Sequence, residues 1–225
     1  MKLCLSTLLL LPFMIFGQGK VDLNENNKLP NDIRWVTDSR EYYDLCHQTY
    51  VAATRSLKRE LKRTKNPIIV MDIDETVLDN SSYQVDLFLT QSEYNSTSWN
   101  MWVKKEISQL VPGAKRFILN YKKYKNARII YISNRSEETL EATKNNMKKL
   151  GIYFDEDIFL LRKDKHDTKI IRRQEVLDGI GRMALYGPQE IIAYFGDAIG
   201  DFPINEKYQF SKNKFLFPNP MYGKW

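Results

Sequence analysis

Two groups of carboxylates follow apolar runs in this chain, and their spacing suits metal-assisted chemistry. Asp72 and Asp74 end the run that begins at Pro67, and Asp197 and Asp201 follow a second run near the C-terminus. Carboxylates grouped in this way repel one another unless a cation lies among them. All-oxygen ligation suits Mg²⁺, which keeps several waters and binds phosphate oxygens. We therefore expect Asp72, the backbone carbonyl of Asp74 and Asp197 to bind Mg²⁺, with Asp201 holding a metal-bound water.

The first pair also has the properties needed for phosphoryl transfer. A carboxylate nucleophile needs no deprotonation, so Asp72 is expected to attack phosphorus and form an aspartyl-phosphate. Asp74 lies two residues after Asp72, where the strand ends, and a bend after the strand would bring it over the same phosphate. There Asp74 would protonate the leaving oxygen and later deprotonate the attacking water. Because such an acid must carry its proton, an acidic pH optimum is expected.

Polar residues at two further positions complete this chemistry. Ser133 and Asn134 follow the apolar run 127–133, and Lys169 lies in a helical segment after the run 157–161. A hydroxyl and an amide can bind phosphate oxygens, and a lysine can neutralise charge on the transferred group. A helix-capping role for Ser133 and a solvated role for Lys169 remain open alternatives.

Unbroken apolar runs separated by helical patterns predict how these residues are brought together. Such runs indicate buried parallel strands, and the βαβ alternation predicts a Rossmann-like three-layer α/β fold. Ligands bind outside the carboxyl ends of the strands in such a sheet, which is where the polar residues occur. The predicted strands are 67–72, 127–133, 157–161, 191–197 and 214–217.

Helix signals define the elements between the strands. An amphipathic pattern predicts one long N-terminal helix over residues 35–65. Pro112 predicts the first turn of another helix, and Ser136 and Gly151 predict the start and the end of the next. Residues 166–179 predict a helix after the third strand.

The ends and insertions of the chain suggest its domain organisation. Lys2 and the apolar stretch behind it predict a signal peptide over residues 1–19, with an uncleaved anchor as the alternative. The remaining residues, 20–225, are expected to form a single domain. Within it, the segment of about 80–110 is rich in Trp, Tyr, Ser and Asn and predicts a small cap inserted after the first strand. The mature protein is expected to be secreted or periplasmic, without a stable membrane anchor.

Composition excludes several other classes of site. After signal cleavage only Cys46 remains, and the two histidines, His47 and His166, are far apart in the sequence. This set cannot form a zinc site or an internal disulfide. The net charge of +6 is spread over helical lysines and arginines, which is typical of solvated faces, so nucleic-acid binding is not expected. A small anionic substrate suits a modest positive field.

The segments that carry these residues resemble a known family. The stretches "IIVMDIDETVLDNSSYQ", "YISNR", "RKDKHDTK" and "YFGDAIGDF" are similar to the four motifs of the haloacid dehalogenase-like phosphatases. More narrowly, they resemble the class C bacterial acid phosphatases, a group that includes lipoprotein nucleotidases. The similarity runs from about Trp35 to the C-terminus.

The resemblance implies roles for individual residues. The nucleophile matches Asp72, the acid–base residue matches Asp74, and the phosphate-binding residue of the second motif matches Ser133. The family lysine matches Lys169 better than Lys163 or Lys165. The resemblance thus implies a Mg²⁺-dependent phosphomonoesterase, and relatives suggest a homodimer.

The resemblance also bears on the substrate. Some relatives hydrolyse nucleoside monophosphates and stack aromatic rings on the base, and the matching positions are Trp99 and Tyr222; both could instead belong to the core of the cap. Two departures from the family pattern occur: Ala198 replaces the usual Asn, and no lipoprotein cysteine is present. The alternatives are a phosphotransferase and a non-catalytic phosphate-binding or storage protein of the same fold.

Overall fold

A parallel sheet forms the centre of the protein in the computed structural model, which describes residues 28–223. The predicted signal peptide, residues 1–19, therefore lies outside the described residues. The five strands stand in the order β5-β4-β1-β6-β7 and all neighbours are parallel. The α/β fold expected from the sequence is confirmed. The strands are β1 (Ile68–Met71), β4 (Arg128–Ser136), β5 (Ile158–Arg162), β6 (Ile191–Gly196) and β7 (Lys214–Leu216).

The unbroken apolar sequence of β1 follows from burial of the sheet on both faces. Ile69 and Met71 belong to one hydrophobic cluster, and Ile68 and Val70 belong to another. Successive side chains of a strand point to opposite faces. Each face of β1 therefore packs against its own layer of helices, and no position in the strand is available for a polar side chain.

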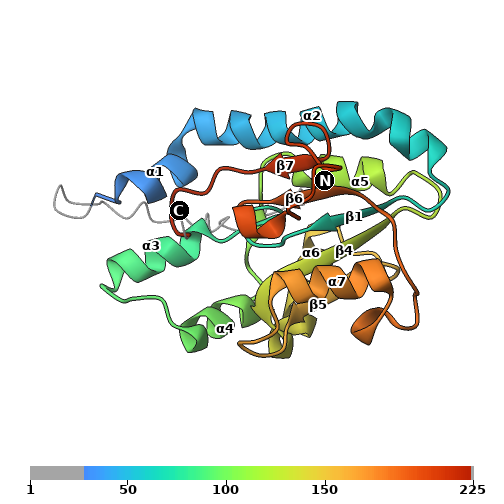
Figure 1. The fold of residues 1–225 in the computed structure, drawn as a ribbon. Coiled ribbons are helices and arrows are strands. Elements are labelled where there is room, and N and C mark those ends of the chain that lie inside the picture. The colour runs from blue at the N-terminus through green and yellow to red at the C-terminus, as the bar shows by residue number, and fades with distance from the viewer. Residues whose placement is uncertain (1–27, 224–225) are drawn as a thin grey trace, which may run out of the picture.

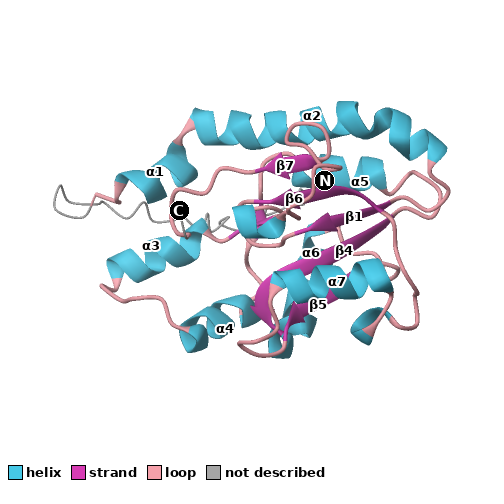
Figure 2. Ribbon diagram, in the orientation of Figure 1, coloured by secondary structure: helices cyan, strands magenta, loops and turns pink. Residues whose placement is uncertain are grey.

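The helical layers are unequal (Figures 1 and 2). Three helices and Val36 of the short first helix contribute to the cluster on one face, and one helix together with a 3₁₀ turn at 181–183 covers the other. No helix among residues 28–223 is long and apolar enough to cross a membrane. The first face is covered by α2 (Arg40–Arg63), α5 (Ala114–Tyr121) and α6 (Leu140–Leu150), and the second by α7 (Lys169–Asp178).

The prediction of a single N-terminal helix over 35–65 was wrong. The chain forms α1 (Asn31–Asp38) and α2 with a break at Ser39, whose backbone is extended. The Ser39 hydroxyl accepts a hydrogen bond from the Tyr42 backbone N–H at 3.0 Å. A serine in this position satisfies one of the free N–H groups of a helix start, which explains why the chain begins a new helix here.

Two other predicted helix starts also differ from the structure. Pro112 lies just before α5, which starts after Gly113 in the left-handed region at φ +92°. Ser136 ends β4, and a 3₁₀ turn at 137–139 separates it from α6. The predicted end of α6 at Gly151 is confirmed, with φ +73°. Local signals therefore identified these helices but misplaced two of their starts by two to four residues.

A small helical cap is inserted after β1. Two short antiparallel strands, β2 (Leu78–Asp79) and β3 (Gln109–Leu110), pair at its base. Between them lie α3 (Ser81–Leu89) and α4 (Ser96–Lys104), which extend away from the sheet in Figure 1. Tyr83, Trp99, Trp102 and Val103 form a hydrophobic cluster of the cap. Because the base strands pair with each other, the cap is attached to the rest of the protein close to the end of β1.

Candidate active site

The carboxyl ends of β1 and β6 place three carboxylates together. The backbone N–H of Asp72 donates to the carbonyl of Phe195 in β6 at 2.9 Å, so Asp72 is still held by the sheet. Asp197 follows β6 directly, and Asp201 ends the 3₁₀ turn Ile199–Asp201. Ligand oxygens of Asp72, Asp197 and Asp201 lie within 4.8 Å of one another. The structure therefore brings together three of the four residues that the sequence predicted as a metal site.

The electrostatics of this cluster favour a bound cation. Burial raises the pKa of Asp72 well above its usual range; Lys169 opposes this shift, and the charges of Asp201 and Asp197 add to it. Burial also raises the pKa of Asp197 to about 6, with the charge of Asp201 adding, against a hydrogen bond from the Asn219 amide at 2.8 Å. A hard divalent cation would remove this repulsion, and the all-oxygen donor set is the one that Mg²⁺ prefers.

Lys169 is the lysine that reaches these acids. Its Nζ lies 2.8 Å from Asp72 Oδ1 as an ion pair and donates a hydrogen bond to Asp201 Oδ1. Burial lowers its pKa, but the two carboxylates outweigh burial and hold the pKa above its ordinary value. Lys163 and Lys165, the other lysines of this segment, are exposed. A fixed ammonium group beside Asp72 is well placed to meet a phosphoryl oxygen.

Ala198, the departure from the family pattern, leaves the backbone contact at this position in place. Its N–H donates to Asp201 Oδ2 at 3.0 Å, and its side chain is exposed. Asp201 is therefore fixed from two sides, by this backbone N–H and by Lys169. No Asn side chain is needed to orient Asp201.

Asp74 follows β1 and contacts the end of β4, the strand on the other side of β1 from β6. The chain bends at Glu75, a non-glycine residue at φ +52° whose N–H donates to Leu78 O. Asp74 Oδ2 accepts a hydrogen bond from Ser133 Oγ at 3.2 Å, and Asp74 Oδ1 accepts one from Arg135 Nε at 2.9 Å. The bend expected after the strand is present. It directs Asp74 to Ser133 of β4, the residue predicted to bind phosphate.

Arg135 is a site residue that sequence reasoning missed. Its side chain is buried, with 1% of its surface exposed, and it forms an ion pair with Asp74. The signal was available: a charged residue lies just after the apolar run 127–133, which predicts a buried strand. Buried arginines are almost always paired, so a carboxylate partner was to be expected.

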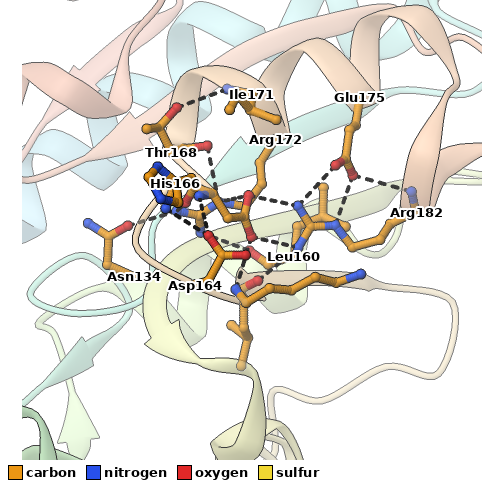
Figure 3. A network of polar contacts seen from close by, with 12 residues as sticks. Asn134, Leu160, Asp164, His166, Thr168, Ile171, Arg172, Glu175 and Arg182 are labelled. Carbon is orange, nitrogen blue, oxygen red and sulfur yellow. Dashed lines mark hydrogen bonds and ion pairs between the residues drawn. The ribbon is translucent and has the colours of Figure 1, made fainter.

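A second arginine, Arg172 of α7, joins the second and third motifs (Figure 3). Its guanidinium donates to the Asn134 side chain at 2.8 Å, to the Ser133 carbonyl, and to the Leu160 carbonyl at 3.1 Å. It also forms an ion pair with Asp167, at 3.4 Å. Burial lowers the pKa of Arg172 to about 10, so the group is charged at neutral pH. This arginine fixes Asn134, which is exposed at the rim of the site.

Arg182 supports this connection from the far side. It forms hydrogen bonds of 3.0 Å to both carboxylate oxygens of Asp167, and Glu175 pairs with its Nε at 2.8 Å. Figure 3 shows these groups as one continuous network below the start of α7. The loop that precedes Lys169 is therefore held by charge-assisted hydrogen bonds, which are stronger than neutral ones.

The two predicted stacking residues have different surroundings. Trp99 is only 8% exposed and packs edge-on against Tyr83 in the cap core, with ring centroids 5.1 Å apart. Tyr222 is 36% exposed, and its hydroxyl donates to Glu75 Oε2. Tyr94 is 60% exposed, and its ring centroid lies 6.5 Å from that of Trp99. The exposed aromatic ring of this part of the cap is therefore Tyr94, which sequence reasoning did not identify.

Comparison with known proteins agrees with this geometry. Residues 18–225 match the acid phosphatase family described as HAD superfamily, subfamily IIIB. The crystal structure of the class C acid phosphatase from Bacillus anthracis with tungstate bound is 31% identical, with a TM-score of 0.71, over 85% of this chain and 84% of that chain. A further structure of the Bacillus anthracis enzyme is 30% identical, with a TM-score of 0.70 and the same coverage.

Curated relatives are more distant. The stem 31 kDa glycoprotein of Glycine max is 28% identical over 167 residues, which are 70% of this chain and 59% of that protein. The stem 28 kDa glycoprotein of Glycine max is 26% identical over 166 residues, 73% of this chain and 63% of that protein. The chain thus spans about three fifths of the length of these relatives. The family match and the solved structures together show that the chain belongs to the acid phosphatases of HAD subfamily IIIB, as the sequence motifs indicated.

Proposed function

We propose that this protein is a secreted, Mg²⁺-dependent acid phosphatase that hydrolyses small phosphomonoesters through an aspartyl-phosphate on Asp72. One observation carries the proposal: Asp72, Lys169 and the acids of the β6 end share one site at the end of β1, and Asp74, two residues after Asp72, bonds Ser133 of the neighbouring strand β4. Phosphoryl transfer depends mainly on positioning and electrostatic stabilisation, and this site supplies groups for both. The solved relative holds tungstate, a tetrahedral oxyanion like phosphate.

The residues divide the reaction into two displacements. In the first, an Asp72 carboxylate oxygen forms a bond to phosphorus, the bond from phosphorus to the leaving oxygen breaks, and Asp74 gives that oxygen a proton. In the second, Asp74 takes a proton from water as the water oxygen bonds to phosphorus. The bond between phosphorus and Asp72 then breaks, releasing phosphate and restoring the carboxylate. In this proposal Lys169 and Ser133 bind phosphoryl oxygens.

The acidic cluster fits a divalent metal. Asp72 and Asp197 would ligate it directly with the Asp74 carbonyl, and Asp201 would hold one of its waters. Bound Mg²⁺ would neutralise charge on the phosphoryl group. Asn219 donates to Asp197 Oδ2 at 2.8 Å, so the carboxylate has a fixed orientation, as ligating carboxylates usually do.

The substrates favoured by this proposal are nucleoside monophosphates. Tyr94 is an exposed ring of the cap beside Trp99, and Tyr222 is a partly exposed ring whose hydroxyl donates to Glu75, next to Asp74. Base–aromatic stacking is sequence-tolerant because every base has a π face, so Tyr94 and Tyr222 offer contact to any nucleobase.

The proposal is tested with residues 20–225 on p-nitrophenyl phosphate between pH 4 and 8, with Mg²⁺ and with EDTA. Phosphate release that needs the metal and is lost in Asp72→Asn is expected, because asparagine cannot form the acyl phosphate. Mg²⁺ should also raise the melting temperature of the wild type by binding the folded state, and less so in Asp197→Asn. A folded wild type that binds Mg²⁺ but releases no phosphate would favour the phosphate-binding or storage alternative.

The substrate class has its own test. Tyr94→Ala and Tyr222→Ala should each raise KM for adenosine monophosphate about tenfold, the loss expected for one stacking contact of roughly 1–3 kcal/mol. Their KM for p-nitrophenyl phosphate should change much less. Tyr43→Ala, which alters an exposed tyrosine of α2, is the matched control. Equal losses on both substrates would argue against base stacking.

A further inference from the structure

The cap and the acid–base residue meet at one buried amide, that of Asn80. Its Nδ2 donates to Asp74 Oδ1 at 3.0 Å and to the Leu78 carbonyl at 3.2 Å. Its Oδ1 accepts hydrogen bonds from Trp102 Nε1 at 3.1 Å and from Ser108 Oγ at 2.7 Å. Asn80 has no exposed surface. The Nδ2 of this amide therefore bonds the predicted acid Asp74, and its Oδ1 bonds two residues of the cap segment.

The positions of these partners show what Asn80 connects. Asn80 itself lies where the chain leaves the sheet, Trp102 lies in α4, and Ser108 lies just before the chain returns through β3. The start, the middle and the end of the cap therefore converge on the Oδ1 atom of one side chain. A shift of the cap relative to the sheet would move this amide and the hydrogen bond that it gives Asp74.

Arg135 holds the same carboxylate from the side of the sheet. In addition to its bonds to Asp74, its Nη1 donates to Thr143 Oγ1 at 3.1 Å, and its Nη2 lies 3.4 Å from Asn80 Oδ1. Thr143 belongs to α6, which contributes Met147 to the cluster under the sheet and packs Ala142 against the cap cluster. Arg135 is itself a residue of β4, so it links the Asp74–Asn80 pair to the sheet.

We infer that Asn80 and Arg135 are positioning residues that orient Asp74 for proton transfer and couple this orientation to the cap. The inference rests on the proposed function. A general acid must come within about 2.6–3.2 Å of the oxygen that it protonates, and a misplacement of about 1 Å can cost roughly 100-fold in rate. Neither residue needs to touch the substrate. A substrate that fixes the position of the cap would thereby also fix the orientation of Asp74.

The leaving group of the substrate gives the test. Nitrophenolate leaves with little help from an acid, whereas the alkoxide of glycerol 2-phosphate must be protonated. Asn80→Ala and Arg135→Met should lose about 100-fold in kcat/KM on glycerol 2-phosphate, since a general acid contributes roughly 10²–10⁴-fold. On p-nitrophenyl phosphate the rapid burst of nitrophenol should remain within about tenfold of wild type. Turnover after the burst should slow, because Asp74 also activates the water.

Further variants separate positioning from folding. The burst amplitude reports the fraction of active protein, so the rates are corrected for misfolded material. Trp102→Phe keeps an aromatic side chain but removes one donor from Asn80 Oδ1, and should show a smaller loss with the same leaving-group selectivity. Arg135→Lys should recover part of the activity on glycerol 2-phosphate, since it retains one charged donor to Asp74.

Asn145→Ala is the matched control. Asn145 also joins the cap to α6, through a 3.0 Å hydrogen bond to Glu106, but it does not contact the Asn80 amide. Its leaving-group selectivity should equal that of the wild type. Equal losses on the two substrates in Asn80→Ala and Trp102→Phe would overturn the inference and leave Asn80 a structural residue. Absence of burst and turnover in the wild type would instead refute the proposed phosphatase activity.

Discussion

At the scale of single residues, the site depends on how closely Asp201 approaches the backbone of β6. A Cβ atom added to Gly196 would lie 2.3 Å from Asp201 Cβ and 2.4 Å from Asp201 Oδ2. Such distances are far below van der Waals contact. Glycine at 196 is therefore required by space and not by backbone conformation, and it allows Asp201 to approach the sheet while bonded to Ala198 and Lys169.

We expect Gly196→Ala to destabilise the protein by about 1–3 kcal/mol, the usual cost of overpacking a filled site. Because the clash falls on Asp201, Mg²⁺ affinity measured by calorimetry should fall as well. Gly200→Ala is the control, since a Cβ there meets no atom within 4 Å. Unchanged metal affinity in a destabilised Gly196→Ala protein would show that Asp201 does not act on the metal.

At the scale of elements, the order of the strands brings the motifs together, and buried arginines then fix the loops. Parallel strands end at one edge of the sheet, so β1, β4 and β6 deliver their polar residues side by side. The loop between β5 and α7 is not hydrogen-bonded into the sheet as a strand. Arg172 and Arg182 attach this loop to the strand ends through Asp167.

We expect Arg172→Met to lower stability by about 1.5–3 kcal/mol, because the buried carbonyls of Ser133 and Leu160 lose a charged hydrogen-bond donor while Asp167 keeps Arg182. It should also weaken inhibition by inorganic phosphate, since Asn134 loses the contact that orients it. Chemical unfolding and phosphate inhibition measure the two effects. Arg59→Met, an exposed change on α2, should alter neither. Phosphate inhibition of wild-type strength in a folded Arg172→Met protein would contradict the role given to Asn134.

At the scale of the whole molecule, the two ends of the sheet differ in function. The carboxyl ends of the strands carry the site, and at the opposite end an ion-pair cluster joins the end of α5 to the start of β5. Lys122 Nζ donates to Asp157 Oδ1 at 2.7 Å and pairs with Glu156 at 2.8 Å. Asp157 Oδ1 also accepts from the Ile129 N–H of β4 at 2.8 Å. Burial raises the pKa of Asp157, although Lys122 and the Ile129 N–H oppose the rise.

This shift predicts a pH dependence of stability. The folded protein binds the Asp157 proton more tightly than the unfolded chain does. The contribution of Asp157 to stability is therefore full below the ordinary aspartate pKa and is lost as the pH rises through the raised folded value. Asp157→Asn removes this loss, so its free energy of unfolding relative to wild type should rise as the pH increases from the ordinary aspartate pKa through the raised pKa of folded Asp157.

Urea unfolding at several pH values measures the effect. Asp44→Asn is the control, because Arg40 lowers the pKa of Asp44 and the sign is reversed: the contribution of Asp44 is present above the ordinary pKa and lost as the pH falls through the lowered value. A stability difference between Asp157→Asn and wild type that does not change with pH would contradict the raised pKa.

The sequence by itself determined the sheet, the family and the residues at the strand ends. Apolar runs identify buried parallel strands locally, and parallel strands must end at one edge, so the convergence of Asp72, Ser133 and Asp197 follows without coordinates. Only the tertiary structure decided the partners of Arg135 and Asn80. Their contacts join residues up to 61 positions apart, and such contacts depend on how the cap and helices pack rather than on local periodicity. The burial of Trp99 and the exposure of Tyr94 were decided by the same packing.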